Sequence, residues 1–181
     1  MKRFGMVLLA VALGVAAARP AMAQGTWRYG FSAGALMPMG GGLDYSTADK
    51  MGFVGGAGAT YWLAGSPLGI RGDLSYSQTS HDGFDGNTKI MGGMASAVYA
   101  LNAASAPARI LLNGGLGYYN VKESVTSTSE SKVGWGIGAA VAFKMGTGST
   151  RLIVGTRYTS VSTTGGATNF LPITVGLSFG K

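Results

Sequence analysis

The sequence predicts an all-β chain: an eight-stranded antiparallel up-and-down transmembrane β-barrel, preceded by a cleaved signal peptide. Three observations lead to this prediction. Apolar side chains recur at every second position in eight segments. Only 12% of the residues are charged, about half the share usual in soluble domains. Glycine supplies 32 of the 181 residues, far above the average of roughly 7%. Such a chain cannot cover a large wet surface with charge.

The first residues have the three parts of a secretory signal peptide. In order, these are a charged start, an apolar run and a small-x-small cleavage site: Lys2 and Arg3, residues 6–18, and Ala21-Met22-Ala23. The apolar run, about 13 residues, is too short for a spanning helix, which needs roughly 20. We therefore expect residues 1–23 to be removed and residues 24–181 to form a single barrel domain.

Composition also limits the partners. The chain has no cysteine, so disulfides do not hold it together. Of the 14 basic residues, three lie in the signal peptide, which leaves 11 against 7 acidic residues and a net charge of +4. No Lys/Arg cluster is interleaved with aromatic residues, and the export signal also argues against a nucleic-acid partner.

The first three segments establish the period of two. The first sets large apolar residues against small and basic ones: Trp27, Tyr29, Phe31, Ala33, Ala35, Met37 and Met39 against Arg28, Gly30, Ser32 and Gly34. The second, residues 52–63, is weaker because glycine and alanine occupy both faces. The third sets Leu68, Ile70, Leu74 and Tyr76 against Arg71, Asp73, Ser75 and Ser77. Each alternation predicts a strand with two unlike faces.

The two middle segments are harder to phase. In the fourth, residues 89–101, the preferred outer set is Met91, Ala95, Ala97, Tyr99 and Leu101, but Ile90, Met94 and Val98 would do nearly as well. In the fifth, residues 109–121, the apolar face holds Ile110, Leu112, Leu116 and Tyr118, and the other face holds Asn113, Gly115, Gly117 and Tyr119.

The last three segments alternate more clearly. The sixth sets Val133, Trp135, Ile137, Ala139, Val141 and Phe143 against Lys132, Gly134, Gly136, Gly138, Ala140, Ala142 and Lys144. The seventh sets Leu152, Val154, Thr156 and Tyr158 against Arg151, Gly155, Arg157 and Thr159, with Ile153 as an exception. The eighth, within residues 169–181, sets Leu171, Ile173, Val175, Leu177 and Phe179 against Pro172, Thr174, Gly176 and Ser178.

The connections alternate in length. Short ones cover residues 64–67, 102–108 and 145–149, and longer polar ones cover residues 40–49, 78–87, 122–131 and 162–169. Six of the seven acidic residues fall in the long connections: Asp44, Asp49, Asp82, Asp85, Glu123 and Glu130. We therefore expect short turns at one end of the barrel and four polar loops at the other.

The composition of the weakly polar face indicates which face of the strands points into the barrel. A soluble barrel would point its apolar face inward and carry many charges outside. Here the other face is mostly Gly, Ser, Ala and Thr, which suits the narrow interior of an eight-stranded barrel. The aromatics tend to lie near segment ends, where the interfacial girdles of a membrane barrel are expected: Trp27, Tyr29, Tyr61, Tyr76, Tyr99, Tyr118, Phe143, Tyr158 and Phe179.

The interior should contain a charge cluster. Asp73 is the sole acidic residue placed within a strand, and it shares its face with Arg71. We expect Arg28, Arg109 and Arg157 to face the same interior. One carboxylate cannot neutralise four guanidinium groups, so the sequence predicts a hydrated, net-positive lumen.

The signal peptide, the alternating segments and the terminal alternation closing on Phe179 resemble the small eight-stranded outer membrane beta-barrel proteins of the OmpX/OmpA transmembrane-domain type, over nearly all of Gln24 to Lys181. The resemblance implies a Gram-negative-type outer membrane, periplasmic termini, external loops, and insertion by the barrel-assembly machinery, which reads the last strand: Ile173, Val175, Leu177 and Phe179. Such chains usually stop at the aromatic residue, whereas this one adds Gly180 and Lys181.

Features that suggest chemistry are weak. His81, the only histidine, is adjacent to Ser80 and Asp82, but three consecutive loop residues cannot converge as a triad. With Asp82 and Asp85 it lacks a fourth ligand for a metal site. The glycine runs at residues 55–58 and 134–138 lie within strands, whereas a dinucleotide fingerprint needs a strand, a turn and a helix. We expect no catalytic residue, cofactor or metal.

The sequence therefore predicts a monomeric, non-catalytic outer-membrane barrel with a structural or surface-interaction role, in contact with outer-membrane lipid and lipopolysaccharide. The first alternative is a small-solute pore or ligand binder that uses the arginine-bearing lumen. A less favoured alternative is an outer-membrane lipid-modifying enzyme that depends on His81.

Overall fold

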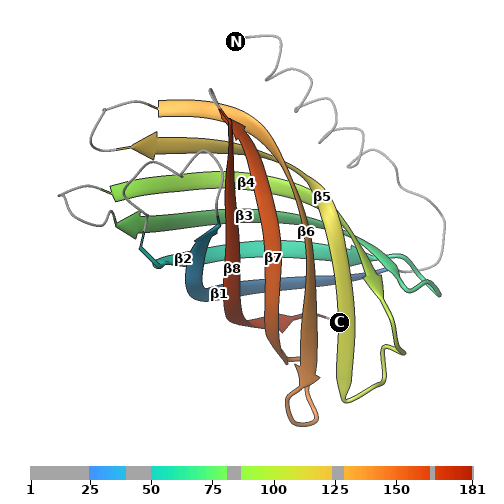
Figure 1. Cartoon of the computed structure of the whole chain (residues 1–181). Helices are drawn as coiled ribbons and strands as arrows, with labels where there is room; N and C mark the ends of the chain where they lie inside the picture. Colours follow the sequence, from blue (N-terminus) through green and yellow to red (C-terminus); the bar gives the residue numbers. More distant parts are fainter. Residues whose placement is uncertain (1–24, 40–49, 81–86, 124–128, 164–165, 181) are drawn as a thin grey trace.

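The chain folds into a closed antiparallel barrel. The computed structural model describes residues 25–39, 50–80, 87–123, 129–163 and 166–180. Within them lie β1 (Thr26–Met39), β2 (Gly52–Trp62), β3 (Leu68–Ser80), β4 (Asn87–Ala100), β5 (Ala108–Glu123), β6 (Ser129–Lys144), β7 (Arg151–Thr163) and β8 (Gly166–Phe179). Each strand pairs with the next, and β1 pairs with β8 (Figure 1). This closure leaves no strand edge open and confirms the predicted fold class.

One predicted feature falls outside this description. The predicted signal peptide, residues 1–23, lies outside the described residues, so its cleavage stays a prediction. No helix in the described part of the chain is long and apolar enough to cross a membrane.

Three of the four polar connections are shorter than predicted, those at residues 78–87, 122–131 and 162–169. Thr163 pairs with Gly166, so most of the predicted loop at residues 162–169 is strand. Lys122 likewise pairs with Ser129 across the predicted loop between β5 and β6. Polar residues show where a hairpin leaves the apolar layer, but its backbone ladder continues beyond that point, which is why polarity alone placed the strand ends too early.

The longer strands change the position of two acidic residues. Glu123 ends β5 and Glu130 lies in β6, so the prediction that both are loop residues is wrong. Asp73 is therefore not the sole acidic residue within a strand. It remains the only one of the three that lies in the middle of a strand.

The apolar face of the strands points outward, as predicted. Leu74 and Leu116, near the middle of β3 and β5, are 71% and 66% exposed. The fourth strand takes the preferred phase, because Met91 is 62% exposed whereas Ile90 is only 4% exposed. In water such a surface would be strongly unfavourable, whereas in a bilayer it meets acyl chains.

Aromatic rings band this outer surface near both ends. At the short-turn end lie Trp27, Tyr29, Tyr61, Tyr99, Phe143 and Phe179, and at the loop end lie Phe53, Tyr76 and Tyr118. Neighbouring rings touch across strands: Trp27 and Tyr61 have centroids 5.0 Å apart, and Phe53 and Tyr76 are 6.1 Å apart. These bands are the interfacial girdles expected of a membrane barrel.

The interior is more apolar than the sequence suggested. At the loop end, inward-facing side chains form a cluster that we call the plug: Leu36, Val54, Ile90, Tyr119, Val161 and Phe170, with Val121 packed against it. A second cluster near the short turns contains Trp62, Val98, Ala100, Leu111 and Ala142, with Ala140 and Ile153 against it. Ile153 breaks the alternation of β7 because it joins this inner cluster.

Candidate functional site in the barrel lumen

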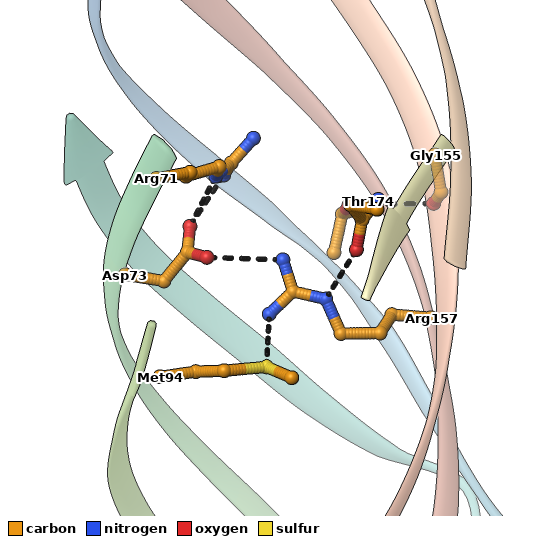
Figure 2. Close-up of polar contacts among 7 residues, drawn as sticks. Arg71, Asp73, Met94, Gly155, Arg157 and Thr174 are labelled. Atoms are coloured by element: carbon orange, nitrogen blue, oxygen red, sulfur yellow. Dashed lines mark hydrogen bonds and ion pairs between the residues drawn. The ribbon is translucent and has the colours of Figure 1, made fainter. Parts of the chain in front are cut away.

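The middle of the lumen holds an ion triad. Arg71 and Asp73 stand two residues apart on the inner face of β3, where their side chains meet: Arg71 Nε and a terminal nitrogen each lie 2.5 Å from Asp73 Oδ1. Arg157 reaches across from β7 and donates to Asp73 Oδ2 at 3.0 Å (Figure 2). Both carboxylate oxygens are thus engaged by charged donors.

Two further contacts fix the Arg157 side chain. Its Nε donates to Asn113 Oδ1 at 3.1 Å. One terminal nitrogen lies 3.2 Å from Met94 Sδ (Figure 2). These contacts link β7 to β3, β4 and β5. Asp73 itself has room because Gly58 stands opposite it, where an added Cβ would lie 2.7 Å from Asp73 Oδ1. The triad therefore ties together opposite sides of the barrel wall.

A second group of arginines lies near the short turns, which we call the mouth: Arg28, Arg109 and Arg151. Arg28 Nε donates to Ser178 Oγ at 3.0 Å, and its terminal nitrogens donate to the carbonyls of Ser178 and Gly180 at 3.2 and 3.3 Å. A further donation reaches the carbonyl of Ser149, in the turn between β6 and β7. Arg28 of β1 thereby connects the C-terminal end of β8 to the turn between β6 and β7.

Arg151 and Arg109 are held differently. Arg151 donates to three backbone carbonyls, those of Ala104, Ala106 and Ala142. The guanidinium carbon of Arg109 lies 3.9 Å from the ring centroid of Trp62, a cation–π contact. Carbonyls and a ring thus replace the carboxylates that these arginines lack.

All five residues of the predicted lumen cluster line the same cavity, of about 160 Å³, together with Arg151. They form two groups rather than one: Arg71, Asp73 and Arg157 at the centre, and Arg28 and Arg109 at the mouth. Sequence reasoning put Arg151 on the inner face without adding it to the cluster. The residues of the proposed assembly signal lie on the lipid-facing side of β8, where Phe179 contacts Phe31 with centroids 5.6 Å apart.

The plug was missed entirely. Tyr119 is 3% exposed and its ring meets Phe170 edge-on with centroids 6.1 Å apart. The ring fits because Gly117 and Gly92 face it: a Cβ at Gly117 would lie 2.7 Å from Tyr119 Cε2, and one at Gly92 would clash with the ring. The available signal was the recurrence of large apolar residues at inner positions of strand ends that adjoin the long connections.

The weaker chemical candidates are not brought together. His81, Asp82 and Asp85 lie outside the described residues, and Ser80 ends β3. Within the described ranges, no group of three or more His, Cys, Asp or Glu side chains could hold a metal. The glycine runs lie inside β2 and β6, as expected of residues that adjust a barrel wall.

A closed eight-stranded barrel with an apolar exterior, aromatic girdles and a polar interior defines an integral β-barrel of the outer membrane. A family model described as the outer membrane protein beta-barrel domain matches residues 7–179. The chain therefore belongs to the outer membrane protein beta-barrel domain family, as the sequence suggested.

Solved structures share the fold. Neisserial surface protein A (NspA) has a TM-score of 0.63 at 16% identity, covering 85% of this chain and 96% of its own. The N-terminal barrel of Pseudomonas aeruginosa OprF scores 0.52 at 15% identity, covering 87% and 100%. The Yersinia pestis attachment invasion locus protein Ail scores 0.51 at 17% identity, covering 86% and 97%. A comparison with functionally curated proteins finds no match.

Proposed function

We propose that this outer-membrane barrel is non-catalytic and monomeric, with a structural or surface-interaction role in the envelope. In this proposal the short turns and both termini face the periplasm and the loops face outward. The observation that carries it is the plug, because buried Leu36, Tyr119 and Val161 block the outer end of the lumen. With its outer end blocked, the lumen is closed to partners outside the cell, and the outer wall and the loops are the surfaces that such partners can reach. A closed barrel also needs no partner strand.

A pair of lysines supports contact with lipopolysaccharide. Lys89 of β4 and Lys122 of β5 stand directly opposite each other on the outer face, and both are exposed. Like charges in this position destabilise a sheet unless an anion lies between them. They lie just beyond Tyr76 and Tyr118 of the loop-end girdle, the height at which headgroup phosphates meet a barrel wall.

Relatives of the same fold suggest a surface role of this kind. One is a surface protein, NspA, and another is an attachment protein, Ail, whose structure was solved with the heparin analogue sucrose octasulfate. The loops and the lysine pair would serve such a role here. During assembly, the apolar face of β8 would be the part read by the barrel-assembly machinery.

The pore is the second candidate, and the arginines that line the cavity favour it. The plug opposes it, because a conducting path would have to displace side chains that are almost fully buried. The lipid-modifying enzyme has less support, since no described residues converge on a nucleophile and base.

Two measurements test the proposal. In planar bilayers the protein should give no steady conductance, and in an outer-membrane fraction it should show heat-modifiable gel migration as a single chain. Stable conductance that disappears in Arg157→Ala would favour the pore instead. A lipid product that depends on His81 would favour the enzyme.

The lysine pair has its own test. The double variant Lys89→Gln/Lys122→Gln should lower the unfolding temperature in bilayers that contain lipopolysaccharide but not in phosphatidylcholine. Lys144→Gln, at the short-turn end, is the matched control and should behave as wild type in both. An equal loss in both lipids would contradict the proposed contact.

A further inference from the structure

We propose that the mouth of the lumen binds a small, multiply charged oxyanion of the phosphate type between Arg28, Arg109 and Arg151. This site goes beyond the surface role proposed above, and its failure would leave that role untouched. It lies at the opposite end of the barrel from the loops and the plug, and it opens toward the short turns.

The positive charges at the mouth are not compensated by a carboxylate among the described residues. The charge of Arg151 repels both Arg28 and Arg109, and Arg28 also repels Arg109. Lys144 adds a fourth positive charge at the rim, since it pairs directly with Arg151 across β6 and β7. Among the described residues, Asp73 is the carboxylate that reaches the lumen arginines, and both of its oxygens are already bonded to Arg71 and Arg157.

Two buried N–H groups at the mouth lack a hydrogen-bond acceptor among the described residues. Arg109 Nε and Trp62 Nε1 each carry an N–H group and are buried, and no acceptor for either lies in the described part of the chain. An unsatisfied buried donor is costly, so two such donors in side chains that touch call for a bound acceptor or a water. The same two side chains are in contact with each other through the cation–π pair, so both donors belong to one site.

Two hollows beside these side chains give a small anion room at the mouth. The cavity of about 160 Å³ is lined by Arg28, Arg109, Arg151 and Trp62. A second hollow, of about 570 Å³, lies among the short turns, and Trp62 and Arg109 line it too. Trp62 and Arg109 therefore border both hollows. The inner cavity is smaller than the pockets that hold drug-sized ligands, which favours a small oxyanion with its hydration.

The chemistry of the donors selects the anion. The Arg109 guanidinium presents a planar fork that matches phosphate oxygens, whereas Arg28 already donates from all three of its nitrogens and contributes charge. Hydrogen bonds to carbonyls hold Arg28 and Arg151 in place before any ligand arrives. A preorganised ring of this kind loses little side-chain entropy on binding, and its charge favours an anion with two or more negative charges.

The test uses the full mature chain in nanodiscs of zwitterionic lipid, titrated with inorganic pyrophosphate. The three tryptophans give three indole N–H signals in nitrogen–proton correlation spectra, and a Trp62→Phe variant identifies the relevant one. The Trp62 signal should shift saturably. The Trp135 signal, from the lipid-facing wall, should stay in place and serves as an internal control.

Variants assign the binding to the mouth. Arg109→Gln should weaken pyrophosphate binding about tenfold, as expected for the loss of a charged hydrogen-bond donor. Lys144→Gln, whose side chain is exposed at the rim, should weaken it about threefold and keeps the test open if Arg109→Gln does not fold. Lys50→Gln removes the same charge from an exposed position at the loop end, just before β2, and should bind as wild type.

A second arm identifies the source of the anion. If headgroups supply it, nanodiscs that contain phosphatidylglycerol should shift the Trp62 signal without pyrophosphate. A shift in either arm supports the site. No saturable shift in either lipid, or equal weakening by Lys50→Gln and Lys144→Gln, would overturn it.

Discussion

The two ends of the lumen are built from opposite materials. At the loop end, inner positions carry the plug, in which Val161 is 0% and Leu36 is 1% exposed. At the short-turn end, they carry the mouth arginines, which are held by carbonyls and an indole. The ion triad lies between them. One face of one sheet can therefore be sealed at one end and charged at the other, because a period of two fixes which residues face inward but not what they are.

This difference assigns different tasks to the two ends. The plug excludes water by packing, so its contribution depends on shape and volume. The mouth instead concentrates positive charge near the short turns, so its contribution depends on electrostatics. Predictions about the plug therefore concern stability and conductance, whereas predictions about the mouth concern ligand binding and salt.

Removing the plug's central ring should have the largest effect. Tyr119→Ala should cost about 3–4 kcal/mol of unfolding free energy and should produce measurable conductance, because the outer end of the lumen is opened. Urea unfolding in vesicles and planar-bilayer recording would measure the two effects.

The adjacent tyrosine is the control. Tyr118→Ala removes a similar ring from the outer face, where the side chain is 55% exposed, and should remain non-conducting. If both variants conducted equally, the plug would not be the barrier.

Breaking the ion triad, which lies between the plug and the mouth, should have the second-largest effect. Asp73→Asn removes the carboxylate shared by Arg71 and Arg157 and should destabilise the barrel by about 3 kcal/mol, since it leaves partly buried charges without a partner. The double variant Asp73→Asn/Arg157→Gln should regain much of the stability that Asp73→Asn loses. Urea unfolding of the wild type, the two single variants and the double variant gives the coupling energy between the two residues. Simple additivity would argue against a triad.

Crowding the Tyr119 ring of the plug should have the smallest effect. Gly92→Ala places a Cβ against the Tyr119 ring and should cost about 2 kcal/mol, the usual penalty for overpacking. Gly72→Ala is the matched control, because a Cβ at Gly72 meets nothing within 4 Å. Heat-modifiable migration as a function of temperature would compare them, and equal melting of the two variants would contradict the tight socket.

Much of the fold could be predicted from the sequence because one physical rule, alternation in a two-sided sheet, operates in every strand. It placed Leu74 and Leu116 outside and Arg71 and Asp73 inside. It was least certain in β4, where Met91 and Ile90 are equally apolar and only the closed structure shows which one faces lipid.

The plug and the mouth could not be predicted in the same way. Val161 and Phe170 belong to different strands, and their meeting depends on register and strand tilt rather than on local pattern. Arg28 and Arg151 are satisfied by carbonyls of distant turns, and backbone acceptors carry no signal in the sequence. Residues that appeared to break a pattern, such as Ile153, instead belong to inner clusters.

The central claim, an outer wall in lipid around a lumen that the plug blocks at its loop end, can be tested by tryptophan quenching. In single-tryptophan variants, lipids with brominated acyl chains should quench Trp135, which is 48% exposed on the outer wall, and spare Trp62, which is 7% exposed. Aqueous iodide, an anion drawn to the mouth, should quench Trp62 and spare Trp135. Quenching of Trp62 by brominated lipid and of Trp135 by iodide would contradict the account.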